Sequence, residues 1–122
     1  MSMPGPVRCT AMLPVSDVAR SVEFYARLGF VLAQVYAPEG RLCWAYVQSG
    51  FADLMLTLSV PDAGTEASPV LFYLYYDDIA GTHAALATSG LEVGEMRHPP
   101  YRPEGEFDLR DPDGHRLMLA HR

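Results

Sequence analysis

Apolar and polar positions along the chain form a repeated pattern that predicts two helices. The segments "DVARSVEFYARLGF" and "DIAGTHAALATSGL", which begin at Asp17 and Asp78, align at an offset of 61 residues. Each begins with a side chain that can accept bonds from free backbone N–H groups, and each reaches a Gly about twelve residues later. In the first segment, apolar residues recur at helical spacing and would form a buried stripe: Val18, Val22, Tyr25 and Leu28.

Short segments rich in Val, Leu, Tyr and Phe surround these helices and have the pattern of β-strands. The expected strands cover residues 7–14, 31–36, 41–48 and 53–59, then 70–76, 91–96, 105–110 and 115–121. The stretch "SVPDAGTEASP" is typical of a linker. We therefore predict an α+β fold in a single domain, 1–122, with two βαβββ modules at about 7–60 and 70–122 and a linker at about 61–69.

Composition narrows the classes of function. The formal charge is −6, and the nine basic residues are all Arg, spread along the chain without a basic stripe, which argues against nucleic-acid binding. The longest apolar runs, such as "VLFYLYY", are too short to span a membrane. Cys9 and Cys43 have no C-x-x-C spacing, and no signal segment precedes them, so we expect a cytoplasmic protein.

Two motifs, "LPVSDVARSVEFYARLGF" and "EFDLRDPDGHRLML", resemble the vicinal oxygen chelate superfamily, which includes glyoxalases, extradiol dioxygenases and bleomycin-resistance proteins. The resemblance covers nearly the whole chain. It implies βαβββ modules whose curved sheets face each other around a cavity, usually completed in a homodimer. In the enzymes of this group, four inward positions hold a divalent metal, normally through His and Glu.

The resemblance places these four metal positions on Thr10, Met55, Leu71 and Met118. Hydroxyl, thioether and aliphatic side chains cannot replace imidazole and carboxylate donors. We therefore expect no metal and no other cofactor. Among the histidines, surface roles are expected for His83, His115 and His121, whereas the loop residue His98 could overhang the cavity.

Alternation along strands extends the predicted cavity beyond the four aligned positions. Side chains at the intervening strand positions, such as Phe107 and Leu109, would point the other way and pack against the helices. Trp44 and Tyr46 share a strand face that the pattern does not assign, and the loop "RHPPYRPEGEF" resembles a ligand-contacting segment of bleomycin-binding relatives. The predicted ligand-binding residues are Thr10, Met12, Met55, Thr57, Leu71, Tyr73, Tyr75, Tyr101, Glu106, Asp108, Arg110 and Met118.

The leading hypothesis is a non-catalytic homodimer that sequesters an aromatic or cationic small molecule, as antibiotic-resistance members do. An alternative is that these Met and Tyr side chains only pack in the hydrophobic core and bind no ligand. A second hypothesis is an enzyme, in which Glu106 or Asp108 is a base, Tyr101 or His98 an acid, and Arg110 holds an anionic substrate. A third is a partner-binding or regulatory module that has lost small-molecule binding.

Overall fold

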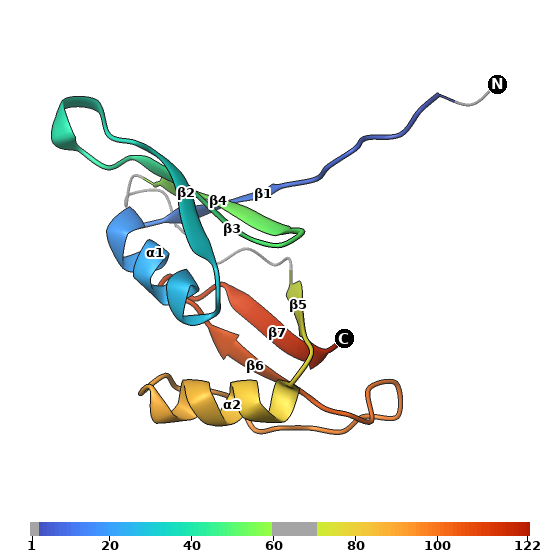
Figure 1. Cartoon of the computed structure of the whole chain (residues 1–122). Helices are drawn as coiled ribbons and strands as arrows, with labels where there is room; N and C mark the ends of the chain where they lie inside the picture. Colours follow the sequence, from blue (N-terminus) through green and yellow to red (C-terminus); the bar gives the residue numbers. More distant parts are fainter. Residues whose placement is uncertain (1–2, 60–70) are drawn as a thin grey trace.

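The computed structural model describes residues 3–59 and 71–122, and its strands form two sheets (Figure 1). The first sheet contains β1 (Ala11–Val15), β2 (Val31–Tyr36), β3 (Trp44–Ser49) and β4 (Ala52–Leu58). The second contains β5 (Phe72–Tyr76), β6 (Glu106–Arg110) and β7 (Arg116–His121). Helices α1 (Val18–Arg27) and α2 (Ile79–Thr88) each follow the first strand of a sheet, and a 3-10 turn, η1 (Pro38–Gly40), separates β2 from β3. The α+β class is confirmed.

Both sheets are wound in the same way, which supports the internal repeat. β1 pairs in parallel with β4, giving the order β1-β4-β3-β2. β5 pairs in parallel with β7, giving the order β5-β7-β6. The first strand of each half thus lies beside the last, and each helix packs on its own sheet, α1 on β2, β3 and β4 and α2 on β7. None of the described helices is long and apolar enough to cross a membrane.

The helices begin and end where the sequence predicts. The Asp17 carboxylate accepts the N–H of Arg20 at 3.0 Å, and the Asp78 carboxylate accepts the N–H of Gly81 at 3.0 Å, so each satisfies a free donor of the first turn. Gly29 and Gly90 follow the helix ends with φ of 104° and 91°. Glycine adopts this left-handed conformation without the strain that a Cβ would add.

The core lies on the helix-facing sides of the two sheets. Alternate strand residues are buried there, as Leu54 and Leu56 in β4 and Phe107 and Leu109 in β6 show. Tyr25 of α1 is fully buried in the same cluster. Because side chains alternate along a strand, the other set in each strand must lie on the face away from the helices. The predicted partition of strand positions between core and opposite face is therefore confirmed for β6.

The expected strand at 91–96 is wrong. This segment follows the edge of β6 through backbone hydrogen bonds at two places: from Gly94 N to Asp108 O at 2.7 Å, and between Arg97 and Glu106 at 2.8 and 2.9 Å. The chain comes so close at Gly94 that a Cβ there would lie 2.7 Å from the Asp108 carbonyl oxygen. The second half is therefore βαββ, with an irregular segment in the place of β2.

Two other expected strands are shorter than predicted, since 7–14 and 41–48 begin only at Ala11 and Trp44. The predicted linker at 61–69 and the expected strand start at residue 70 lie outside the described residues.

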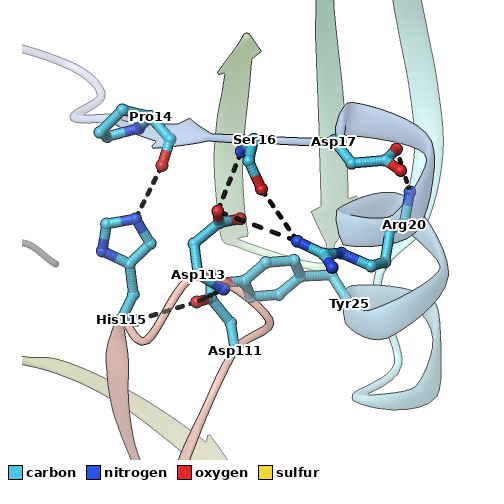
Figure 2. Close-up of polar contacts among 8 residues, drawn as sticks. All are labelled: Pro14, Ser16, Asp17, Arg20, Tyr25, Asp111, Asp113 and His115. Carbon is cyan, nitrogen blue, oxygen red and sulfur yellow. Dashed lines mark hydrogen bonds and ion pairs between the residues drawn. The ribbon is translucent and has the colours of Figure 1, made fainter. Parts of the chain in front are cut away.

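The Asp111–Gly114 turn joins the two halves through a buried carboxylate (Figure 2). One oxygen of Asp111 accepts the N–H groups of Asp113 and His115, and the other accepts the hydroxyl of Tyr25 at 2.8 Å. Asp113 in turn accepts the N–H of Ser16 at 2.9 Å. Burial of the ring, and then the charge of Asp111, raise the pKa of Tyr25. These hydrogen bonds stabilise the turn and also attach it to the end of β1 and to α1.

His115 is buried within this connection, so the expected surface role is wrong. Its Nε2 lies 2.8 Å from the carbonyl oxygen of Pro14 in β1, and its backbone N–H binds Asp111. A carbonyl oxygen can only accept, so Nε2 is the donor. The turn position suggested exposure because the strand β1 that covers the ring is distant in sequence.

Removal of the Tyr25 hydroxyl should weaken the whole fold. Tyr25→Phe leaves one buried oxygen of Asp111 without its side-chain donor, and we expect the free energy of unfolding to fall by about 1–3 kcal/mol. Urea unfolding followed by circular dichroism measures this change. The control is Tyr36→Phe, because the Tyr36 ring is exposed on the edge strand β2. Equal stability of the two variants would contradict the role assigned to the Tyr25–Asp111 bond.

Candidate ligand-binding site

The face of the second sheet that is turned away from the core carries seven predicted residues, and we call it the second open face. It consists of Leu71, Tyr73, Tyr75, Glu106, Asp108, Arg110 and Met118, of which Glu106 and Met118 are buried within the single chain. The Tyr73 and Tyr75 rings stack with centroids 5.9 Å apart. Strand register forms two rows across β5, β7 and β6: Tyr73, Met118 and Asp108 in one, and Tyr75, Ala120 and Glu106 in the next. The structure therefore brings the aromatic, thioether and acidic positions of this half together.

Tyr101 reaches the second open face from the loop before β6. Its hydroxyl donates to Oε2 of Glu106 at 3.2 Å, although its ring is 68% exposed. Partial burial of the hydroxyl, then the charge and hydrogen bond of Glu106, raise the pKa of Tyr101, with smaller contributions from Tyr73. Glu106 itself is only 3% exposed. The loop tyrosine thus lies beside a buried carboxylate of the second open face, and its contact with a ligand stays a prediction.

An arginine of the same chain accompanies each carboxylate on this face. Arg116 Nε lies 3.1 Å from Asp108 Oδ2, and Arg102 Nε lies 3.9 Å from Glu106 Oε1. Arg110 is exposed and donates to the carbonyl oxygen of Gly114 at 2.9 Å, so it contributes to the turn at one end of the sheet. The acidic edge expected from the sequence is therefore largely neutralised within the chain.

The first sheet has a corresponding face, the first open face, which carries the other four predicted residues. Met12 of β1 lies opposite Met55 of β4 and is 55% exposed. Thr57 follows two positions after Met55 on the same side, and Thr10 precedes β1. The Thr10 hydroxyl is buried and has no hydrogen-bond partner within the described part of the chain. Strand register thus places Met12 and Met55 side by side, and the role of these four residues in ligand binding stays a prediction.

Register also adds Trp44 and Tyr46 to the first open face, a placement that the sequence left unassigned. Trp44 lies opposite Thr57, and Tyr46 lies opposite Met55. Their rings are parallel, with centroids 6.5 Å apart. The Tyr46 hydroxyl donates to Asp53 at 2.7 Å, which fixes its ring. Ala45 and Val47 alternate with these two residues along β3, and both are buried in the core. The sequence shows this alternation, but only the pairing of strands shows which set faces the core.

A hollow of about 550 Å³ lies beside Tyr73 and Tyr75. Its other walls come from the β3–β4 turn around Phe51, from the end of α1 near Leu28, and from the C-terminal Arg122. A second hollow of about 370 Å³ lies beside Tyr46 and Asp53 and shares Phe51. Each open face therefore borders a hollow beside the same turn, and the hollow next to Tyr73 and Tyr75 also has walls from the first sheet.

Within one chain the two open faces remain separate. The polar and ring contacts of their described residues stay inside one face or the other. In Figure 1, α1 lies between the two sheets. Two hollows nevertheless have walls from both sheets, one beside Phe51 and Tyr75 and one beside Asp53 and Tyr73. A cavity that a second chain completes stays a prediction.

The residues present do not fit the divalent metal that the resemblance implies. The aligned positions offer one hydroxyl, two thioethers and an aliphatic side chain, none of which is a usual ligand of such a metal. Across residues 3–59 and 71–122, no group of three or more His, Cys, Asp or Glu residues is placed to hold a metal ion. His98 belongs to no such group, and its Nδ1 lies 3.0 Å from the Pro103 carbonyl oxygen of its own loop.

Titration of Tyr101 tests the geometry of the second open face. Glu106→Gln removes a negative charge beside the phenol, so the pKa of Tyr101 should fall towards its ordinary value of 10.0. Nuclear magnetic resonance of ring-labelled tyrosine measures this pKa in both proteins. An unchanged pKa in the variant would show that Tyr101 and Glu106 are not paired in solution.

Comparison with known proteins extends these observations. A family model described as the Glyoxalase/Bleomycin resistance protein/Dioxygenase superfamily matches residues 8–119. A search of curated proteins finds no match. A bleomycin-binding protein complexed with bleomycin has a TM-score of 0.74 and 23% identity, over 96% of this chain and 99% of that one.

Two further solved structures span different functions. TnmS3, an antibiotic-binding protein from Streptomyces sp. CB03234, has a TM-score of 0.75 and 25% identity, over 98% of each chain. Lactoylglutathione lyase from Agrobacterium tumefaciens has a TM-score of 0.73 and 17% identity, over 97% of this chain and 96% of that one. Likenesses at such low identity show the fold, whereas the family match spans nearly the whole sequence. The chain belongs to the glyoxalase/bleomycin resistance protein/dioxygenase superfamily.

Proposed function

We propose that two copies of this chain sequester an aromatic small molecule between the first open face of one copy and the second open face of the other. The observation that carries the proposal is that each open face exposes large apolar side chains above a packed core: Met12 on the first face, and Tyr73 and Tyr75 on the second. Met12 is 55% exposed and Tyr75 is 54% exposed, although the alternate residues are buried in the strand of Met12 and partly buried in the strand of Tyr75. Exposed apolar patches of this kind mark surfaces that bind a partner or ligand.

The need for two faces follows from the strength of the contacts. An aromatic pair contributes about 0.5–1.5 kcal/mol, whereas micromolar affinity requires about 8 kcal/mol. A ligand lying on one face alone would leave its other side in water. Enclosure between two faces allows the stacked pairs Trp44–Tyr46 and Tyr73–Tyr75 to contact it together.

The similarity to antibiotic-binding proteins supports this class of ligand. Bleomycin is bound in one similar structure, and TnmS3 is described as an antibiotic-binding protein. The paired arginines weaken the expectation of a cationic ligand, because Glu106 and Asp108 already face Arg102 and Arg116. The proposal therefore rests on aromatic and thioether contact rather than on charge.

Catalysis is the second candidate, and the Tyr101–Glu106 hydrogen bond favours it. A phenol beside a carboxylate can transfer a proton, and the raised pKa of Tyr101 keeps the phenol protonated at neutral pH, although it also makes the phenol a weaker acid. Lactoylglutathione lyase activity that Glu106→Gln abolishes, without a loss of folding, would favour this candidate over sequestration.

Calorimetric titration tests the binding proposal directly. The purified chain should bind bleomycin or another member of a panel of planar aromatic antibiotics with a saturable heat. Tyr75→Ala should weaken binding at least about tenfold, the effect of 1.4 kcal/mol. The control is Val35→Ala, since Val35 pairs with Ala45 and so lies on the opposite side of the first sheet. Absence of saturable binding across the panel would refute the proposal.

A mixing experiment tests whether the site is shared between two copies. Met55→Asp and Tyr75→Asp each damage one open face, so neither variant should bind by itself. Mixed after joint unfolding and refolding, they should recover about a quarter of the wild-type sites, because half the dimers are mixed and each mixed dimer has one intact site of two. Sedimentation should give a mass near twice 13.5 kDa.

The result that would overturn sharing is full loss of binding in the mixture although mixed dimers form. Such a result would place both open faces of one site in the same chain.

A further inference from the structure

The Arg102 side chain occupies the position beside Tyr75 and Glu106 where a ligand cation would bind. Its guanidinium carbon lies 5.2 Å from the centroid of the Tyr75 ring, which is cation–π distance. Its Nε lies 3.9 Å from Oε1 of Glu106. One arginine of the chain therefore makes both contacts that would recognise a positively charged ligand group.

Strand register explains why this position has room for a guanidinium. Tyr75, Ala120 and Glu106 form one row across β5, β7 and β6, and the middle residue has the smallest side chain. Ala120 is nevertheless fully buried, so other atoms cover it. Arg102 donates from a terminal nitrogen to the His121 carbonyl oxygen at 3.0 Å, next to Ala120 in β7. These contacts place its guanidinium over the gap between the tyrosine and the carboxylate.

The loop holds Arg102 in this position. Backbone hydrogen bonds from Arg102 N to Pro99 O at 2.8 Å and from Gly105 N to Arg102 O at 3.0 Å form two successive turns. The adjacent Tyr101 bonds the other oxygen of the same carboxylate. Two consecutive loop side chains therefore meet at Glu106. The positive charge beside Glu106 therefore comes from the chain itself and not from a ligand.

The pairing of Arg102 with Glu106 is incomplete. Arg102 Nε and Glu106 Oε1 are both buried, and neither has a hydrogen-bond partner among the described residues. The contact thus balances charge without forming the short hydrogen bond of a strong ion pair. A charged ligand group would meet the positive charge of Arg102 first, since the carboxylate lies almost entirely out of reach of solvent.

We propose that Arg102 sets the charge specificity of the site, so that the ligand group placed against Tyr75 is neutral or anionic. The inference rests on the proposed function and names its ligand class more closely. A cationic group must either displace Arg102 from its bond to His121 or bind beside a like charge in a poorly hydrated place. A neutral or anionic aromatic group stacks on the tyrosines without either cost.

Two fluorescent probes of opposite charge test this specificity. The anionic dye 8-anilinonaphthalene-1-sulfonate and the cationic dye thioflavin T are titrated against the wild type and against Arg102→Met, which keeps an apolar side chain over Tyr75. The wild type should bind the anionic dye more tightly. In the variant, the ratio of the two dissociation constants should move towards the cation by at least about tenfold.

Two further variants separate a charge effect from damage to the loop. Arg97→Met removes the same charge from an exposed position in the same segment, so it is the matched control. Arg102→Lys keeps the charge, and its ratio of the two dissociation constants should lie between those of the wild type and Arg102→Met. Thermal unfolding followed by circular dichroism shows that each variant is folded.

The outcomes distinguish the two proposals. If both dyes bind and Arg102→Met changes their affinities by the same factor, or no more than Arg97→Met does, the role of Arg102 is overturned while the binding site stands. If the wild type prefers the cationic dye, Arg102 also does not set specificity. If neither dye binds to any of the proteins, the proposed function itself fails, and the inference with it.

Discussion

The buried Asp111 carboxylate is the constraint on which the arrangement of this molecule depends. It closes its own turn by accepting two backbone N–H groups, and it accepts the hydroxyl of Tyr25 from the helix of the other half. A buried carboxylate must be satisfied in this way, because an unpaired charge in the interior is very costly. The turn therefore fixes α1 and β1 against the second half. In this arrangement the two open faces do not face each other within one chain.

That arrangement links packing to function. The core takes side chains from every strand except β2, and the opposite sides of the sheets carry stacked tyrosines, a tryptophan and methionines. Methionine adapts its shape to a ligand, and rigid aromatic rings give contact area at little entropic cost. Glu106, Tyr101 and Arg102 then add charge and hydrogen-bonding groups at one end of the second open face. Binding of a planar molecule needs no reactive group in such a site.

The amino-acid pattern predicted what depends on neighbours in sequence. Helix caps at Asp17 and Asp78 and strand alternation around Met55 are local, and the structure agrees with them. Burial does not alternate around Met118, because its neighbours on both sides of β7 are covered. The pattern could not predict contacts between residues that are distant in sequence and meet only in the folded chain. The face of Trp44, the burial of His115 beneath β1 and the cation placed over Tyr75 by Arg102 are of this kind. The expected strand at 91–96 failed because the chain approaches β6 too closely at Gly94 for regular pairing.

The central claim is that one ligand contacts both open faces at once. Methionine provides the probe, because Met55 lies on the first open face and Met118 on the second. With methyl-labelled methionine and a saturating aromatic ligand, nuclear Overhauser effects between ligand protons and protein methyl groups report direct contact. The account predicts such effects from the same ligand ring to both Met55 and Met118. Contacts to only one of these methyl groups, in a fully bound sample, would contradict it.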